Sequence, residues 1–468
     1  MIDKRKWFGT EIQLEVEGQH NSLILPHPEI RDDLGSSHPD AQWFKNAGLG
    51  IFLHWGISAV DGRIDISWGM LSYGEYVGKE EGDGGNLTEE DEGTVLSTDF
   101  KLKPSRYFAL AKDFNAEKYN PGEWMAMAKK AGFRYAVLTA KHCDGFMLWP
   151  SEYGGYSTKM YLGGRDLVRE FVDACRANDI KVGIYFTPTD WYLNRNHMSF
   201  MHYMARRKNP DLPEVDVDFV PMDMPPASEM ERQKKLHGIM HRGQLHELLT
   251  NYGKIDVLWF DGGSPKGEVY PLEDIYRLQP GVVVTTRMHG YGDFKNCEVK
   301  FADQKPAGWW EYCTIWSKRP AWAYTNDTVY RPTNKIIIEL IKTRNWGGNY
   351  LLNIGPKASG EFPAAAVAGL EELADWMKKN GESVLNTESL PDGEKSNVYA
   401  TAGKGTRYLF ILPDFEGMAS LSGIGEPHSV AITGTGRQVR YSFEQDELTI
   451  DVHDIKKANE IIAIKICL

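Results

Sequence analysis

Up to about residue 385, short apolar runs alternate with longer stretches in which apolar residues recur at helical spacing. Runs of roughly four to eight apolar residues are typical of strands buried on both faces. The pattern predicts strands at 48–55, 135–139, 182–186, 257–260, 282–286 and 350–354, and helices at 121–130, 167–178, 230–249, 272–278, 332–343 and 363–380. Strands that alternate with helices indicate a parallel sheet, and this number of units favours a (β/α)8-like barrel over a doubly wound sheet.

The pattern changes after about residue 386, where short apolar runs follow one another with turns between them. These runs predict strands at 408–412, 429–432, 439–443, 448–452 and 461–466. Closely spaced short strands are typical of a small antiparallel β-sandwich. We therefore expect two domains, a catalytic barrel with an N-terminal arm over residues 1–385 and a C-terminal β-sandwich over residues 386–468. The acidic, Gly-rich stretch 79–98 is expected to be a surface loop.

The run Val257–Phe260 is followed directly by Asp261 and two glycines. A carboxylate at the C-terminal tip of a buried parallel strand lies where α/β barrels keep their catalytic groups. Its ordinary structural interpretation is a cap for the helix that follows. Other polar residues stand at or near the ends of predicted strands, namely His54, Lys141, His142, Cys143, Asp144, Tyr185, Asp190, Trp191, Arg287, Glu298 and Asn353. Each alone could be a structural residue, so their joint occurrence is the evidence for a site.

Composition narrows the classes of function. Aromatic residues make up 12% of the chain, with 14 Trp and 22 Tyr, and aromatic rings pack in cores or stack on the apolar faces of sugars. The net charge is −12, and no basic cluster lies among aromatics, so we expect no nucleic-acid partner. The five cysteines form no CxxC pair, which favours a reducing compartment. With no long apolar run for a membrane, we expect a cytoplasmic protein, although a leader removed beforehand would leave no trace.

Several kinds of site are not expected. His237 and His241 have metal-ligand spacing, but no HExxH motif is present, and the chain lacks both Gly-rich phosphate-binding motifs. We therefore expect no metal and no organic cofactor. Two carboxylates accompanied by an arginine and aromatics suit glycoside cleavage, in which one carboxyl protonates the leaving oxygen and the other attacks or activates water.

Five stretches resemble glycoside hydrolase family 29, the retaining α-L-fucosidases. They are 50–56 (GIFLHWG), 131–146 (AGFRYAVLTAKHCDGF), 181–186 (KVGIYF) with Asp190-Trp191, 256–262 (DVLWFDG) and 348–356 (GNYLLNIGP). The resemblance spans about 300 residues in the expected order and implies a barrel followed by a β-sandwich. Family members often form oligomers, so the resemblance also implies that this chain could form a homo-oligomer.

The resemblance also implies roles for individual residues. Asp261 matches the nucleophile, and Trp259 lines the fucose pocket beside it. His54, His142 and Tyr185 match positions that touch sugar hydroxyls, and Arg287 matches an arginine near the reacting carboxylate. Glu298 is our choice for the acid/base, because the run 293–298 resembles the segment that carries it in some members. Glu311 is the second candidate, although its match looks structural.

Two positions depart from the family pattern. Cys143 stands where the family usually has a second histidine, and Ser67-Trp68 stands where it usually has Glu-Trp. We count Trp68 and Cys143 among the substrate-binding candidates, and Glu75 could replace the missing glutamate. Losing an imidazole and a carboxylate removes strong hydrogen bonds to ring hydroxyls, which predicts an altered sugar or linkage preference.

The sequence therefore predicts a retaining exo-α-L-fucosidase that acts on terminal α-L-fucosyl linkages of oligosaccharides or glycoconjugates. One alternative keeps the mechanism and changes the sugar to a relative of fucose, such as an α-L-galactoside. The other is a sugar-binding protein that has kept the fold without catalysis.

Overall fold

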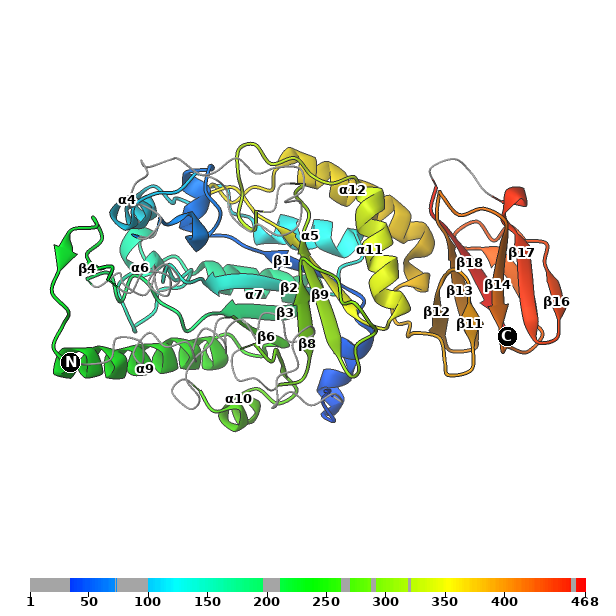
Figure 1. The fold of residues 1–468 in the computed structure, drawn as a ribbon, viewed down its shortest axis with the longest axis horizontal. Helices are drawn as coiled ribbons and strands as arrows, with labels where there is room; N and C mark the ends of the chain where they lie inside the picture. Colours follow the sequence, from blue (N-terminus) through cyan, green and yellow to red (C-terminus); the bar gives the residue numbers. More distant parts are fainter. Residues whose placement is uncertain are drawn as a thin grey trace.

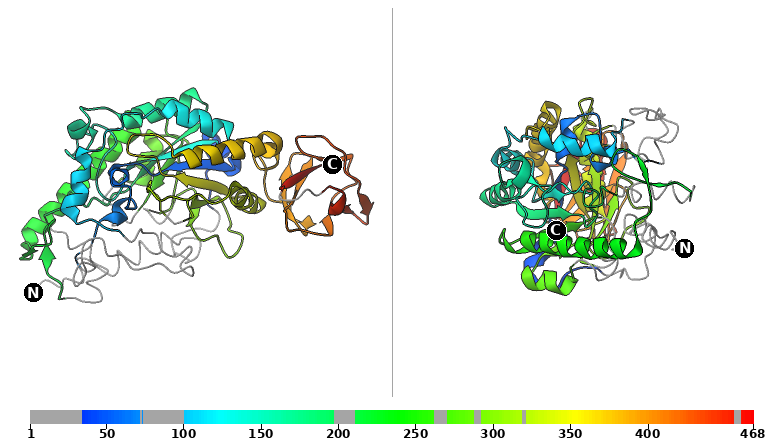
Figure 2. Two further views of the ribbon diagram at one scale, coloured as in Figure 1. Left: turned by 90° about the horizontal axis from the view of Figure 1, so that it is seen from above. Right: turned by 90° about the vertical axis from the view of Figure 1, so that its left-hand side faces the viewer.

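The computed structural model describes residues 34–71, 73, 100–196, 211–261, 270–287, 292–318, 321–455 and 460–468. Figures 1 and 2 show a larger body that holds the parallel strands and most helices, and a smaller group of strands beyond α11 and α12. The predicted acidic loop 79–98, Glu75 and most of the predicted N-terminal arm lie outside the described residues.

The larger body is built on one sheet of eight strands. They are β1 (Leu49–Leu53), β2 (Tyr135–Lys141), β3 (Lys181–Phe186), β6 (Val257–Phe260), β7 (Val283–Val284), β8 (Lys295–Glu298), β9 (Trp310–Ile315) and β10 (Asn349–Ile354). Their spatial order is β7-β6-β3-β2-β1-β10-β9-β8, and every pair is parallel. A parallel bridge between Thr285 and Phe294 joins the two outermost strands, so the curled sheet closes there. The predicted barrel fold is confirmed.

Strands β8 and β9 were missed by the sequence analysis. The β8 segment reads Lys-Asn-Cys-Glu and β9 contains Glu311, so neither is a continuous apolar run. Both are nonetheless buried, apart from the partly exposed Glu298. Glu311 is accommodated because Trp259 and Tyr135 donate hydrogen bonds to it. Glu298 is accommodated because Arg287 donates to it. These donors come from other parts of the chain, so no window of sequence reveals them.

Helices pack around the sheet. They are α4 (Pro104–Ala109), α5 (Pro121–Lys130), α6 (Thr158–Tyr161), α7 (Leu167–Ala177), α9 (Ala227–Thr250), α10 (Leu272–Leu278), α11 (Thr333–Asn345) and α12 (Ala364–Asn380). Six of them were predicted with bounds that agree to within a few residues, whereas the short helices α4 and α6 were not predicted. Asp166 caps α7, because its side chain accepts a hydrogen bond of 2.8 Å from the backbone N–H of Arg169.

Shorter elements complete the larger body. They are the 3-10 segments η1 (Pro39–Asn46), η2 (Ile57–Val60), η3 (Ser67–Gly69), η5 (Leu110–Lys112) and η7 (Gly381–Ser383), and the two-stranded pair β4 (Glu214–Val215) and β5 (Pro221–Met222). None of the helices in the described part of the chain combines the length and apolar character that a membrane span requires.

The barrel interior has its own apolar cluster. Every second residue of a strand points inward, and inward residues such as Phe52, Tyr185 and Trp259 pack together there. Phe44 of η1 joins the same cluster and is fully buried. A separate, larger cluster lies between the sheet and the helices.

The C-terminal strands form two antiparallel sheets, ordered β11-β14-β17-β16 and β12-β13-β18-β15. The strands are β11 (Lys395–Ser396), β12 (Tyr399–Gly403), β13 (Thr406–Ile411), β14 (Met418–Ser422), β15 (Ser429–Ile432), β16 (Ser442–Glu444), β17 (Glu447–Asp451) and β18 (Ile462–Cys467), with η8 (Val452–Asp454) after β17. Side chains from both sheets share one core, and the predicted β-sandwich is confirmed. The domain boundary at residue 385 stays a prediction.

The sandwich lies beside the end of the barrel where the strands begin. Arg344 donates hydrogen bonds to the carbonyls of Gly348, which precedes β10, and of Val384, which leads toward the sandwich. The backbone N–H of Ala400 bonds to the side chain of Asn345 at 2.9 Å. The opposite end of the barrel, where the strands finish, is therefore free of the sandwich.

Candidate active site

The candidate residues meet because they follow inward-facing core residues on parallel strands. His54 is two positions beyond Phe52, and Asp261 is two positions beyond Trp259, so each points inward one step further along its strand. Arg287 follows β7, and Glu298 is the last residue of β8. The carboxyl ends of parallel strands lie at one end of a barrel, which brings these groups together.

Arg287 connects the two candidate catalytic carboxylates. Its Nη2 donates to Asp261 Oδ1 at 2.7 Å, its Nε donates to the same oxygen at 3.1 Å, and its Nη1 donates to Glu298 Oε2 at 2.5 Å. The guanidinium is 1% exposed, whereas the carboxylate side chains are 16% and 13% exposed. Burial opposes the charge on Arg287, but the two carboxylates outweigh it and raise the pKa of Arg287. The pair of carboxylates thus opens to solvent above a buried cation.

Tyr185 holds the other oxygen of Asp261. Its hydroxyl donates to Asp261 Oδ2 at 2.7 Å, so each carboxylate oxygen has a donor. Burial and the charge of Asp261 raise the pKa of Tyr185 well above its usual value, which keeps the phenol protonated. The resemblance had linked Tyr185 to sugar hydroxyls, and the structure places it on the carboxylate.

Trp259 forms the floor beneath these groups. The guanidinium carbon of Arg287 lies 4.7 Å from the centre of its ring, and the ring of Tyr185 stacks on it at 5.6 Å. The indole Nε1 donates to Glu311 Oε1 at 2.9 Å, and the hydroxyl of Tyr135 donates to Glu311 Oε2 at 2.5 Å. Trp259 is thereby fixed from below by a buried carboxyl group.

The two acid/base candidates lie at different depths in the barrel. Glu298 is opposite Cys313 in the β8–β9 register, and Cys313 is two residues beyond Glu311. Glu311 is fully buried, and burial raises its pKa to about 7. Glu298 is therefore nearer the open end, beside Asp261, and Glu311 is beneath Trp259.

Two histidines line the site beside Tyr185. His54 Nδ1 lies 2.7 Å from Asn353 Oδ1, and the ring of Trp322 is 4.7 Å away. Burial, reinforced by neighbouring His142, lowers the pKa of His54 to about 3, so its ring is neutral. The ring of His142 is nearly parallel to that of Tyr185, at 5.5 Å.

Comparison with known proteins decides the family. The family model of the alpha-L-fucosidases matches residues 29–382. The chain belongs to the alpha-L-fucosidase family. The resemblance recognised in the sequence is therefore confirmed, and the chain is a member of a glycoside hydrolase family.

Relatives of the family match most of the chain. The tissue alpha-L-fucosidase of Rattus norvegicus is 27% identical over 478 positions, which cover 95% of this chain and 93% of that protein. Among solved structures, alpha-L-fucosidase isoenzyme 1 from Paenibacillus thiaminolyticus has a TM-score of 0.69 at 26% identity, covering 92% of this chain and 99% of that one. An alpha-L-fucosidase from Bacteroides thetaiotaomicron, solved as a trapped covalent intermediate, has a TM-score of 0.70 at 22% identity, covering 93% and 98%. These likenesses support the fold of barrel and sandwich.

The two positions that are expected from the sequence to depart from the family pattern, Ser67 and Cys143, are both buried. Ser67 is fully buried, and its Oγ lies 2.6 Å from His142 Nδ1, so its hydroxyl contacts a site histidine. Cys143 is 7% exposed, and its Sγ lies 4.0 Å from the hydroxyl of Thr187. Burial and the charge of Asp261 raise the pKa of the Cys143 thiol, which stays protonated.

Trp68 is more exposed than the other substrate-binding candidates. Its side chain is 43% exposed, and its ring meets the edge of Trp191 at 5.6 Å. Asp144 has the ordinary structural role considered from sequence, because it accepts hydrogen bonds from the backbone of Phe146 and the hydroxyl of Tyr107. Lys141 forms a buried ion pair of 3.3 Å with Asp190.

Sequence reasoning missed Trp322 and Asp65. Trp322 contacts His54, and Asp65 accepts hydrogen bonds from the backbone N–H groups of Trp322 and Ala323. Trp322 could have been found from its position shortly after a barrel strand, but that strand, β9, was not predicted. Asp65 lies in the irregular segment after β1, where a carboxylate has no recognisable pattern.

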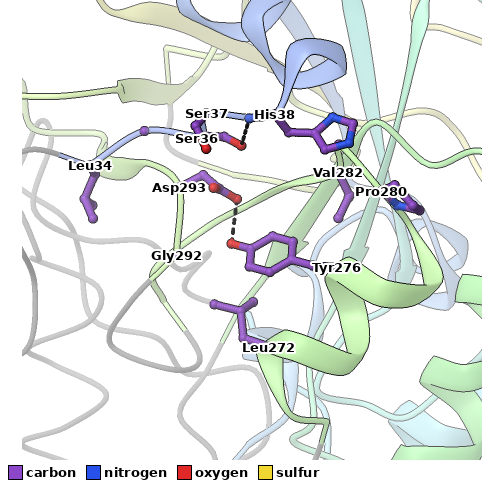
Figure 3. Close-up of a pocket in the computed structure, with 12 residues that line it drawn as sticks. Leu34, Ser36, Ser37, His38, Leu272, Tyr276, Pro280, Val282, Gly292 and Asp293 are labelled. Carbon is purple, nitrogen blue, oxygen red and sulfur yellow. Dashed lines mark hydrogen bonds between the residues drawn. The ribbon is translucent and has the colours of Figure 1, made fainter.

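Two other kinds of site, a metal site and a surface cavity, were sought away from the two candidate catalytic carboxylates. In the part of the chain that the structure describes, no three His, Cys, Asp or Glu side chains gather as a metal site would require. A cavity of about 640 Å³ lies where β7 and β8 begin, and its walls include His38, Tyr276 and Asp293 (Figure 3). Its walls contain none of the predicted site residues and come in part from Val282 and Asp293, which precede β7 and β8, whereas Asp261 follows β6.

Proposed function

We propose that this chain hydrolyses terminal α-L-fucosyl linkages of oligosaccharides or glycoconjugates with retention of configuration. The observation that carries the proposal is the arrangement of Asp261 and Glu298 on one buried arginine. Cleavage of a glycoside needs two carboxyl groups with different roles beside the anomeric carbon. Family membership supports fucose as the sugar.

In the first step Asp261 attacks the anomeric carbon and Glu298 protonates the leaving oxygen. Tyr185 and Arg287 hold the two oxygens of Asp261, which orients the attacking carboxylate. In the second step Glu298 takes a proton from water, which attacks the anomeric carbon and releases the sugar. Once Asp261 is esterified, Arg287 has one charged carboxylate left to pair with, which favours the ionised form of Glu298.

We propose Glu298 over Glu311 as the acid/base. Glu298 lies at the open end of its strand and shares Arg287 with the nucleophile. Glu311 is fully buried and accepts hydrogen bonds from Trp259 and Tyr135. A proton donor to the leaving oxygen must reach the substrate, so Glu311 is better suited to supporting the floor of the site.

A panel of nitrophenyl α-L-glycosides tests the proposed function. We expect the fucoside to be cleaved, and ¹H NMR to show the α-anomer as the first product, as retention requires. Faster cleavage of the galactoside would favour the alternative sugar, which the thiol of Cys143 and the hydroxyl of Ser67 make worth testing. Tight binding of fucose without any cleavage would identify a sugar-binding protein and overturn the proposal.

Replacing Tyr185 by phenylalanine removes one donor from Asp261. A hydrogen bond to a charged group contributes about 1.5–3 kcal/mol, so kcat/KM should fall about 10- to 100-fold. Tyr135→Phe is the matched control, because the same change then affects Glu311 below the site. Equal losses in the two variants would contradict a specific role for Tyr185.

The buried Glu311 predicts a dependence of stability on pH. Its pKa rises from 4.5 to about 7 on folding, so the native state keeps a proton that the unfolded chain releases. Stability is then highest below pH 4.5 and is lost as the pH rises toward 7, by up to about 1.4 kcal/mol per pH unit. Thermal melts of Glu311→Gln should show a shallower loss of stability with pH over this range. Some pH dependence should remain, because folding also raises the pKa of Asp65. An unchanged slope would refute the assignment.

A further inference from the structure

The side chain of Asn353 has an orientation that its neighbours determine. Its Nδ2 donates to the backbone carbonyl of Trp322 at 2.7 Å. A carbonyl oxygen only accepts hydrogen bonds, so the amide nitrogen must face Trp322. The amide oxygen of Asn353 then faces His54 Nδ1, at 2.7 Å.

This orientation determines which nitrogen of His54 carries the proton. The amide oxygen of Asn353 can only accept, so Nδ1 of His54 must be the donor. In a neutral ring the other nitrogen, Nε2, is then an acceptor. Among the described residues, the only hydrogen bond of the His54 ring is the one at Nδ1, so Nε2 is available to a ligand.

We infer that Asn353 holds His54 as the neutral Nδ1–H tautomer. The contact with a sugar hydroxyl that the family resemblance implies for His54 is then made by Nε2, as a hydrogen-bond acceptor. The identity of the substrate rests on the proposed function, whereas the tautomer does not. Burial and His142 lower the pKa of His54 and keep the ring neutral, although the hydrogen bond to Asn353 and the charges of Asp261 and Glu298 act in the opposite direction. A neutral acceptor suits a sugar hydroxyl, which can donate its proton, and a site built this way discriminates against analogues that lack the hydroxyl.

Asp65 holds the other side of the same peptide segment. Its Oδ1 accepts from the backbone N–H of Trp322 at 2.8 Å and from that of Ala323 at 2.9 Å, and the side chain is fully buried. Trp322 is therefore held through its N–H by Asp65 and through its carbonyl by Asn353. We assign both as positioning residues, because they act on the substrate through His54 and Trp322.

Nitrogen NMR of the full chain labelled with ¹⁵N-histidine tests the tautomer directly. Comparison with His54→Gln assigns the two ring nitrogens of His54. We expect Nδ1 to show the shift of a protonated nitrogen and Nε2 that of an unprotonated one, unchanged from pH 5 to 8. Added L-fucose should shift the Nε2 signal. A proton on Nε2, or a titration within this range, would overturn the inference.

Two substitutions of His54 separate its nitrogens in activity. Glutamine can place an acceptor oxygen near the position of Nε2, whereas asparagine keeps only a donor near the position of Nδ1. We expect kcat/KM on an aryl α-L-fucoside to be at least about 10-fold higher for His54→Gln than for His54→Asn, the effect of one hydrogen bond. Higher activity in His54→Asn would overturn the acceptor role. If the unsubstituted protein cleaves no fucoside, the proposed function fails, while the NMR result still decides the tautomer.

The positioning residues are tested by the same spectrum. Asn353→Ala removes the acceptor, so His54 should show a mixture of tautomers and kcat/KM should fall about 10-fold. Asp65→Asn retains an acceptor oxygen for the two N–H groups and should keep the wild-type tautomer, whereas Asp65→Ala should behave like Asn353→Ala. A single unchanged tautomer in Asn353→Ala would refute the positioning role.

Discussion

Replacing Asp261 by asparagine is expected to lower kcat on an aryl α-L-fucoside by about 10⁴-fold or more, as loss of a nucleophile does in other enzymes. An amide is uncharged and cannot form the glycosyl ester that a retaining mechanism requires. It still offers an oxygen to Arg287, whose two hydrogen bonds to Asp261 Oδ1 are 2.7 and 3.1 Å. Folding should therefore be preserved, which circular dichroism and a thermal melt would check.

Asp256→Asn is the matched control for this experiment. Asp256 precedes the same strand at its opposite end, where its carboxylate accepts from the backbone of Val182 and pairs with Lys181. Its replacement should change stability and leave kcat nearly unaltered. A substantially active Asp261→Asn variant would remove Asp261 from the role of nucleophile.

The second large effect is expected for Glu298. Removing a general acid costs about 10²- to 10⁴-fold, so Glu298→Ala should lose that much kcat/KM on natural linkages. Aryl fucosides with good leaving groups need less protonation and should lose less in the first step. Azide is a small anion that needs no general base, and adding it should restore turnover and produce fucosyl azide.

Glu311→Gln is the comparison variant for Glu298. It keeps an oxygen that can accept from Trp259 Nε1, so the floor of the site should be preserved. We expect the Glu311 variant to respond little to azide and to show similar losses on good and poor leaving groups. Rescue by azide in a Glu311 variant, with none in Glu298→Ala, would transfer the acid/base role to Glu311.

The strands that read clearly from sequence are those that are apolar along their whole length. Val257–Phe260 is such a run, and its observed bounds match the predicted ones. Asp261 stood out because a charged residue follows this run directly. Helices could be predicted equally well. For example, Leu272–Leu278 and Pro121–Lys130 have apolar residues at helical spacing and a proline at the start or just before it.

Strands β8 and β9 could not be predicted, because their buried polar residues are stabilised by hydrogen-bond partners that are distant in sequence. Glu311 is acceptable inside the barrel because Trp259 and Tyr135 donate to it, and those residues come from β6 and β2. Without such donors a buried carboxyl group is strongly unfavourable. The sequence around Glu311 taken alone therefore does not indicate a strand, although β9 is completely buried in the folded barrel.

The sequence by itself determined the barrel followed by a sandwich, the family, and the position of Asp261 at the end of a buried strand. These features depend on local periodicity and on motifs whose residues are adjacent in the chain. Only the tertiary structure decided that Arg287 joins Asp261 to Glu298, that Glu311 lies beneath Trp259, and that Ser67 contacts His142. It also revealed the contacts of Asn353 and Asp65 with the segment around Trp322. The physical reason is that hydrogen bonds between strand ends depend on the closure and register of the barrel. Strands β8 and β9, which are needed for this closure, have too few consecutive apolar residues to be recognised from the sequence.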